Sequence, residues 1–281
     1  MKNEIEGYLR MLSHKELSPV YYSFELINYK EITKKSAIGE IKTSLPLNEL
    51  VGKNICITFY DEIRCIDCGK ITKKSFGGGS CYNCLVSLAS NDFCILKPSE
   101  CHFHKGTCRE EEWGKAHCFQ KHIVYLANST GIKVGITKEN PYTKRWVDQG
   151  AIAGLPLLEV KSRLESGLLE IEIAKHIPDK SSWQKLISED SDFIDLEKKS
   201  SEILELINLK KLDFQPQILK PQITNISYPI KSYPNKKKSL KPNFKESLNL
   251  ELLGIKGQYL LFSEGALNIR SLSGYRVKVN T

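Results

Sequence analysis

Hydrophobic and polar residues alternate along the first part of the chain, with the period of half-buried β-strands. The alternation is clear at residues 19–26 and 54–60. It returns near the end of the chain, at residues 257–262 and 275–279. Because about 35 residues of strand bury little surface alone, we expect this C-terminal element to pack on another part of the protein, with the N-terminal strands as the first candidate.

A different pattern begins after residue 120. Residues 122–127 and 132–137 are two apolar runs separated by polar turn residues, which predicts a β-hairpin. A short helix is predicted at residues 142–149, followed by a third strand at 155–160 and a longer helix that begins near residue 166.

The longer helix has a definite apolar side. Leu169, Ile173 and Ile177 have the spacing of a buried stripe. Glu170 lies at the edge of this stripe, whereas Glu172 points elsewhere. Glu170 is therefore the acidic residue of this helix that we expect beside the core.

These patterns predict an α+β protein with a central three-stranded sheet flanked by helices. The expected segments are an N-terminal β-rich region (1–64), a cysteine-rich zinc-binding region (65–120), an α/β domain (121–213), a Pro/Lys-rich linker (214–247) and a C-terminal β element (248–281).

The composition is that of an ordinary globular protein. The chain has 281 residues, of which 41% are apolar and 26% charged. No stretch approaches the roughly 18–20 consecutive apolar residues of a membrane helix, and the start of the chain lacks the apolar core of a signal peptide. We therefore expect a cytoplasmic protein without a membrane partner, and the composition does not indicate an oligomeric state.

The positive charge is concentrated in one segment. The chain carries a net charge of +8, but residues 214–245 hold seven lysines and no acidic residue, which leaves +1 for the rest. The same segment has five of the eleven prolines and no glycine, a composition that favours an extended linker. Its lysines either bind phosphates through counterion release or only keep the linker soluble. The near-neutral remainder counts against a large phosphate-binding face.

Eight of the nine cysteines fall between residues 65 and 118. Cys65 and Cys68 form one CxxC pair, and Cys81 and Cys84 form another. The glycine-rich stretch between the pairs allows the two turns to face each other around one tetrahedral ion. In a reducing compartment, this spacing predicts a structural zinc ribbon in preference to disulfides or redox chemistry.

The other four clustered cysteines match no standard zinc finger. They are Cys94, Cys101, Cys108 and Cys118. We expect them to hold a second zinc ion, because the surrounding loops offer little apolar material to fold on. His102 or His117 could replace one of the cysteines.

The segment from His122 to about Asp179 resembles the GIY-YIG nuclease superfamily. The resemblance rests on the order of Tyr125 in the first strand, Lys133-Val-Gly135 in the second, Arg145 ten residues beyond that glycine, and Glu170 in the later helix. More broadly, the chain resembles a bacterial family that joins a cysteine-rich ribbon to this module and that has no established activity.

The resemblance implies cleavage of phosphodiester bonds with one divalent metal ion, Mg²⁺ or Mn²⁺. In that reading Glu170 holds the ion, Arg145 neutralises the scissile phosphate and Tyr125 helps to activate the attacking water. The sequence departs from the superfamily pattern at two positions, and either change could weaken or remove cleavage. Lys133 replaces the tyrosine of the second motif, and Gln149 stands where histidine or tyrosine is common.

Three functions therefore remain open. The first is a metal-dependent nuclease that acts on DNA or RNA. The second is a zinc-stabilised nucleic-acid adaptor without catalytic activity. The third is a protein-interaction scaffold that binds no nucleic acid. Taken singly, Tyr125 can be a packed aromatic, Arg145 can stack on its neighbours and Glu170 can be merely solvated.

Overall fold

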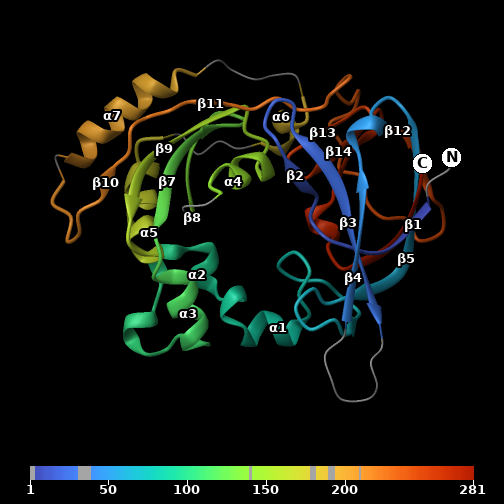
Figure 1. The fold of residues 1–281 in the computed structure, drawn as a ribbon, viewed down its shortest axis with the longest axis horizontal. Helices are drawn as coiled ribbons and strands as arrows, with labels where there is room; N and C mark the ends of the chain where they lie inside the picture. The colour runs from blue at the N-terminus through green and yellow to red at the C-terminus, as the bar shows by residue number, and fades with distance from the viewer. Residues whose placement is uncertain (1–3, 31–38, 139–140, 178–181, 189–193, 209) are drawn as a thin grey trace. The chain divides into compact units, whose positions relative to one another are not determined.

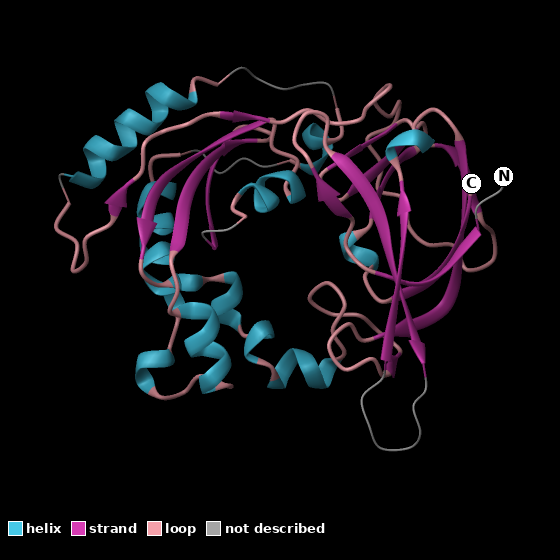
Figure 2. Ribbon diagram, in the orientation of Figure 1, coloured by secondary structure: helices cyan, strands magenta, loops and turns pink. Residues whose placement is uncertain are grey.

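The computed structural model describes the chain except for residues 1–3, 31–38, 139–140, 178–181, 189–193 and 209. It mixes helices and antiparallel sheets, which confirms the predicted α+β class. Contacts divide it into two compact units. Unit 1 comprises residues 1–86, 187–189 and 227–281, and unit 2 comprises residues 87–186 and 190–226. Figure 2 shows that the regular structure of unit 1 is mainly strand, whereas the longer helices lie in unit 2. This division falls within the predicted 65–120 region, so the two cysteine clusters belong to different units.

Unit 1 is built on an antiparallel sheet of eight described strands. Six of them follow the order β12-β5-β16-β1-β3-β2, while β4 pairs with β3 and β6 with β5. The strands are β1 (Glu4–Leu9), β2 (Ser13–Lys15), β3 (Tyr21–Lys30), β4 (Gly39–Pro46), β5 (Asn54–Arg64), β6 (Ile71–Thr72), β12 (Leu248–Glu251) and β16 (Tyr275–Asn280). Because β16 lies between β5 and β1, the expectation that the C-terminal element packs on the N-terminal strands is confirmed.

A second sheet of unit 1 contacts the lysine-rich segment. Its strands are β13 (Gly254–Lys256), β14 (Tyr259–Phe262) and β15 (Gly265–Asn268). The backbone of Lys238 accepts a hydrogen bond from Ala266, and Leu240 donates one back to Ala266. The backbone beside lysines 236–238 is therefore held by hydrogen bonds to this sheet, and the three lysine side chains are exposed. The segment is extended, as predicted. It is not a free linker, because backbone groups between its prolines form hydrogen bonds with the edge strands of the sheet.

The sheet of unit 2 contains the predicted hairpin. β7 (His122–Asn128) lies between β8 (Ile132–Lys138) and β9 (Ala153–Val160), and every residue of β7 is buried. Figure 1 shows these three strands side by side. The sheet has more strands than the three predicted, because β10 (Gln217–Ile218) and β11 (Thr224–Asn225) of the lysine-rich segment both pair with β9.

Helices α5 (Arg163–Ala174) and α7 (Leu196–Asn208) pack on one face of this sheet, and α4 (Thr143–Asp148) packs on the other, where Trp146 contacts Tyr125 and Gly154. Ser162 caps α5 by accepting a hydrogen bond from the backbone of Glu165. Leu169 and Ile173 of α5 are buried among side chains of β7, β9 and α7, which confirms the predicted apolar stripe. No described helix is long and apolar enough to cross a bilayer. The helices outside unit 1 are α2 (Phe93–Leu96), α3 (Glu111–Cys118), α4 (Thr143–Asp148), α5 (Arg163–Ala174), α6 (Trp183–Leu186) and α7 (Leu196–Asn208), with α1 (Tyr82–Ser87) at the boundary.

Candidate functional site

Two short turns of unit 1 bring the first four cysteines together. The sulfur atoms of Cys65, Cys68, Cys81 and Cys84 all lie within 4.8 Å of one another. Those of Cys68 and Cys81 are 3.9 Å apart. A tetrahedral zinc ion with bonds of about 2.3 Å needs sulfurs separated by roughly 3.8 Å. This group can therefore hold a metal ion such as zinc, as its spacing predicted.

The local backbone explains why the two turns meet. Cys65 begins the turn between β5 and β6, and the backbone amide of Cys81 donates to its sulfur at 3.1 Å. The amide of Ile66 donates to the carbonyl of Gly79. Gly79 has a φ of +140°, and a Cβ atom there would lie 2.6 Å from the Ile66 side chain. Only glycine fits this close approach, so the glycine-rich stretch fixes one cysteine turn against the other.

The four thiols have unequal environments. Burial raises the pKa of Cys65 and of Cys84. The backbone amide of Cys84 is the main influence that lowers the pKa of Cys81 to about 7. A bound cation offsets the cost of burying thiolates. Because four sulfurs close a tetrahedral site, a metal held there stabilises the fold and offers no open position to a substrate.

The other four clustered cysteines surround one small cavity in unit 2. Cys94, Cys101, Cys108 and Cys118 line a space of about 10 Å³, together with Asp92 and His102. That volume is roughly the space of one water-sized atom. Burial raises the pKa of Cys94 to about 11 and also raises that of Cys118.

The donors grouped closest in this cluster include two that were predicted, Cys94 and the alternative ligand His102, and one that was not, Asp92. Ligand atoms of Asp92, Cys94 and His102 lie within 4.8 Å of one another. Sequence reasoning missed Asp92, whose only signal is that it stands two residues before Cys94. His117 does not line the cavity, because it stacks on Trp113 with the ring centroids 4.1 Å apart.

Tyr125 is held in the centre of the unit 2 sheet. It is 1% exposed, and its hydroxyl donates to Oε1 of Gln149 at 2.9 Å. Its ring packs edge-on against Trp146 at 5.6 Å. Gly135 faces it across the hairpin, and a Cβ atom there would lie 2.6 Å from the tyrosine ring and hydroxyl. Because Gly135 has no side chain, the ring and hydroxyl of Tyr125 fit against its backbone.

Tyr125, Arg145 and Glu170 lie within electrostatic range of one another. Burial raises the pKa of Tyr125 to about 12, against the lowering effect of Arg145. Burial also raises the pKa of Glu170, while the charges of Arg145 and Arg163 lower it. Arg145 itself is exposed on α4. The structure thus brings together a buried phenol, a half-buried carboxylate and an exposed guanidinium.

Arg163 is a further charged group of this region, and no sequence motif indicated it. It begins α5 and donates to the carbonyl of Ile95 at 2.8 Å. Its positive charge acts on Glu170 and also on the thiols of Cys94 and Cys118. Arg163 therefore links the second cysteine cluster electrostatically to the carboxylate.

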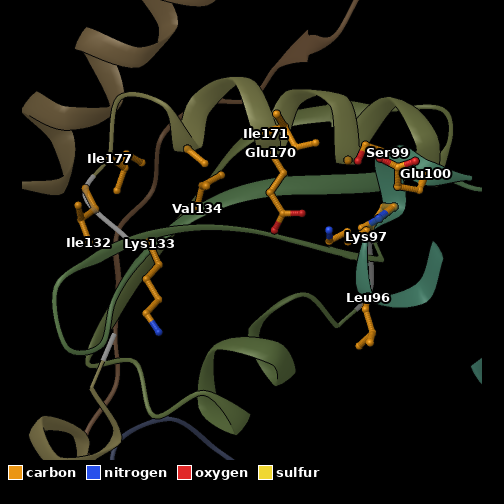
Figure 3. Close-up of a pocket in the computed structure, with 13 residues that line it drawn as sticks. Leu96, Lys97, Ser99, Glu100, Ile132, Lys133, Val134, Glu170, Ile171 and Ile177 are labelled. Carbon is orange, nitrogen blue, oxygen red and sulfur yellow. The ribbon is translucent and has the colours of Figure 1, made fainter. Parts of the chain in front are cut away.

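A cavity of about 450 Å³ borders Glu170 (Figure 3). It lies between β8, α5 and the 3₁₀ turn η3 (Pro98–Glu100) that follows α2. Lys133 also lines it, so two of the predicted site residues share this cavity. In Figure 3 the carboxylate of Glu170 points away from the axis of α5, and Lys133 extends from the strand to the side away from that helix.

Comparisons with known proteins give one match. A search of curated proteins and a search of solved structures each found no significant match. A family model described as "Protein of unknown function (DUF2797)" matches residues 52–277, which is well over half of the chain and includes both cysteine clusters and the cavity. The chain therefore belongs to the DUF2797 family.

Proposed function

We propose that this protein is a metal-dependent, nuclease-like enzyme that cleaves phosphodiester bonds of nucleic acid at a GIY-YIG-like site in unit 2. The observation that carries the proposal is that Tyr125, Arg145 and Glu170 lie within electrostatic range of one another, with Glu170 lining a cavity. These three side chains come from β7, α4 and α5, which are distant in sequence. A fold that served packing alone would not need a carboxylate and a guanidinium beside a buried phenol.

Each residue suits one part of the chemistry. Glu170 would hold one Mg²⁺ or Mn²⁺ ion, which when bound neutralises phosphate charge and lowers the pKa of a bound water. Arg145 is exposed and can donate to two phosphate oxygens at once. The Tyr125 hydroxyl is positioned by Gln149 and would help to take the proton from the attacking water. Lys133 adds a positive charge on the side of β8 that faces away from α5.

A second candidate function is a nucleic-acid adaptor that binds without cutting. The observation in its favour is the state of Tyr125, whose hydroxyl already donates to Gln149 and whose pKa is raised to about 12 by burial. Proton transfer near neutral pH works best with a group of closer pKa. In this alternative Arg145 and Lys133 hold phosphates, and the zinc-binding cysteines only support the fold.

Substitution of Glu170 separates the two functions. We expect Glu170→Gln to abolish Mg²⁺-dependent or Mn²⁺-dependent cleavage and to leave affinity for nucleic acid nearly unchanged, because the amide keeps the shape but loses the charge that holds the ion. Glu172→Gln is the matched control, since Glu172 lies on the same helix but pairs with Lys175 and Lys210. The assay incubates purified protein with single- and double-stranded DNA and RNA.

The possible outcomes are distinct. Cleavage that disappears in Glu170→Gln and persists in Glu172→Gln supports the nuclease. Wild-type protein that binds but cuts none of these substrates supports the adaptor. Equal cleavage by all three proteins places the activity elsewhere and refutes the assignment of Glu170.

We also infer that a second zinc ion binds among Cys94, Cys101, Cys108 and Cys118. The support is that all four sulfurs line one cavity of atomic size. Elemental analysis should give two zinc ions per wild-type chain and one per Cys118→Ser chain. A ratio of one in the wild-type protein would refute the second site and leave the first intact.

A further inference from the structure

The cavity beside Glu170 is larger than a metal ion and its waters require. Its volume of about 450 Å³ falls within the roughly 300–1,000 Å³ typical of pockets that hold small organic ligands. Metal binding at Glu170 therefore leaves most of this space unexplained. Its shape and lining indicate what else enters it.

The walls of the cavity are mainly aliphatic. Ile132 and Val134 line it from β8, Ile171 and Ala174 from α5, and Pro98 from η3. Burial of apolar ligand surface against such walls contributes about 25 cal/mol per Å². A ligand that fills the cavity must therefore have an apolar body.

One end of the cavity is fixed by tight packing. A Cβ atom at Gly167 of α5 would lie 2.4 Å from the backbone nitrogen of Ser99 and 2.6 Å from Pro98. Helix α5 thus contacts η3 without an intervening side chain. The cavity keeps a defined width because the two walls are in direct contact there.

The charged residues of the cavity are mixed, so the identity of the ligand follows from the role of Glu170 and not from net charge. Lys97 lines the cavity together with Glu100 and Glu170, and the side chain of Lys133 points away from α5. Glu170 is the group that the proposed function places at the scissile phosphate. An apolar body joined to a phosphate is the chemistry of a nucleotide.

We propose that the cavity takes an unpaired base of the nucleic-acid strand, namely the base next to the bond that is cut. The proposal rests on the proposed function, because Glu170 locates the cut bond. A base pair within a duplex cannot enter, since its base is stacked and its edge is covered by its partner, whereas an unpaired base enters at little cost. The substrate class is then single-stranded nucleic acid, or a duplex with an unpaired nucleotide.

The test compares three oligonucleotides of one sequence: a single strand, a full duplex, and a duplex with one bulged 2-aminopurine nucleotide. Ala174→Phe fills the mouth of the cavity, where Ala174 is exposed, and Ala174→Leu is a smaller version of the same change. Ser201→Phe is the control, because Ser201 is exposed on α7 and does not line this cavity. Tryptophan fluorescence on heating verifies that each variant is folded.

We expect the wild-type protein and Ser201→Phe to cut the single strand and the bulge at least roughly tenfold faster than the full duplex, the scale of one base contact. Ala174→Phe should lose this preference, and Ala174→Leu should lose part of it. Equal rates on all three oligonucleotides, or an unchanged preference in folded Ala174→Phe, would overturn the inference and leave the nuclease proposal standing.

Fluorescence of 2-aminopurine without divalent metal separates the inference from the nuclease proposal. If no oligonucleotide is cut, the nuclease proposal fails. A fluorescence change on binding that Ala174→Phe removes would then still support base insertion. No change in the wild-type protein would overturn it.

Discussion

Gly135→Ala offers the sharpest test of the packing around Tyr125. The new Cβ atom would lie 2.6 Å from the ring and hydroxyl of Tyr125, well inside ordinary contact distance. The ring cannot move away freely, because Trp146 packs against it and Oε1 of Gln149 accepts a hydrogen bond from its hydroxyl. Overpacking of this kind costs about 1–3 kcal/mol, and a strained hydrogen bond costs about 1 kcal/mol more.

One effect acts in the opposite direction. Gly135 does not have the positive φ that favours glycine, so alanine would stabilise the strand by about 0.5–1 kcal/mol if space were available. The net expectation is a loss of about 2 kcal/mol in the free energy of unfolding of unit 2. In a Tyr125→Leu background, where the ring is absent, the same substitution should be neutral or stabilising.

Urea unfolding followed by tryptophan fluorescence measures this effect. Trp113, Trp146 and Trp183 all lie in unit 2, so the signal reports that unit. The four proteins form a double-mutant cycle, and we expect a coupling energy of about 1–3 kcal/mol between positions 125 and 135. A loss of the same size in both backgrounds would refute the reasoning, since the contact with Tyr125 would then not be its cause.

Three further predictions concern the metal site, the anchored lysines and pH. Cys65→Ser should lose the zinc ion of unit 1, measured by elemental analysis, and should lower the melting temperature, because a missing thiolate opens the tetrahedral site. Changing Lys236, Lys237 and Lys238 to Gln should reduce the slope of log affinity against log salt by up to about three, at roughly 0.7–0.9 per phosphate contact. Burial lowers the pKa of His122 to about 4, so the folded state binds fewer protons than the unfolded state between about pH 6.5 and 4. The free energy of unfolding should therefore be full above this pH range and should fall by about 2 kcal/mol between pH 7 and pH 5, as urea unfolding would show.

Each of these predictions has a result that contradicts it. Unchanged zinc content in Cys65→Ser would mean that the first four cysteines do not form one site. An unchanged salt slope would assign the lysines to solubility, with Lys198 and Lys199 of α7 as the comparison. The pH effect should vanish in His122→Phe, and its persistence there would place the titrating group elsewhere.

Sequence reasoning succeeded where the determining interactions are local. The hairpin of β7 and β8 follows from two apolar runs and a polar turn, and the register pairs Tyr125 with Gly135. The first four cysteines come together because each CxxC turn is complete within a few residues. Such features depend on nearby residues, so their signals can be read along the chain.

The remaining features depend on pairing between distant segments. The lysine-rich segment has the composition of a linker, yet β10 and β11 pair with β9, because an open sheet edge accepts any extended chain that reaches it. The second cysteine cluster has irregular spacing, so nothing local indicated that Asp92 would join Cys94 and His102. The cavity could not be predicted, since its walls come from three separate elements.

The position of β16 has a consequence for how the protein is made. This strand lies between β5 and β1 in the sheet of unit 1, but it follows all of unit 2 along the chain. On the ribosome, β1 and β5 therefore emerge early and have no partner for their facing edges until residues 275–280 leave the exit tunnel. Unit 2 is complete before then and can fold first. Throughout that interval the uncovered strand edges of the nascent chain are open to pairing with the wrong strand.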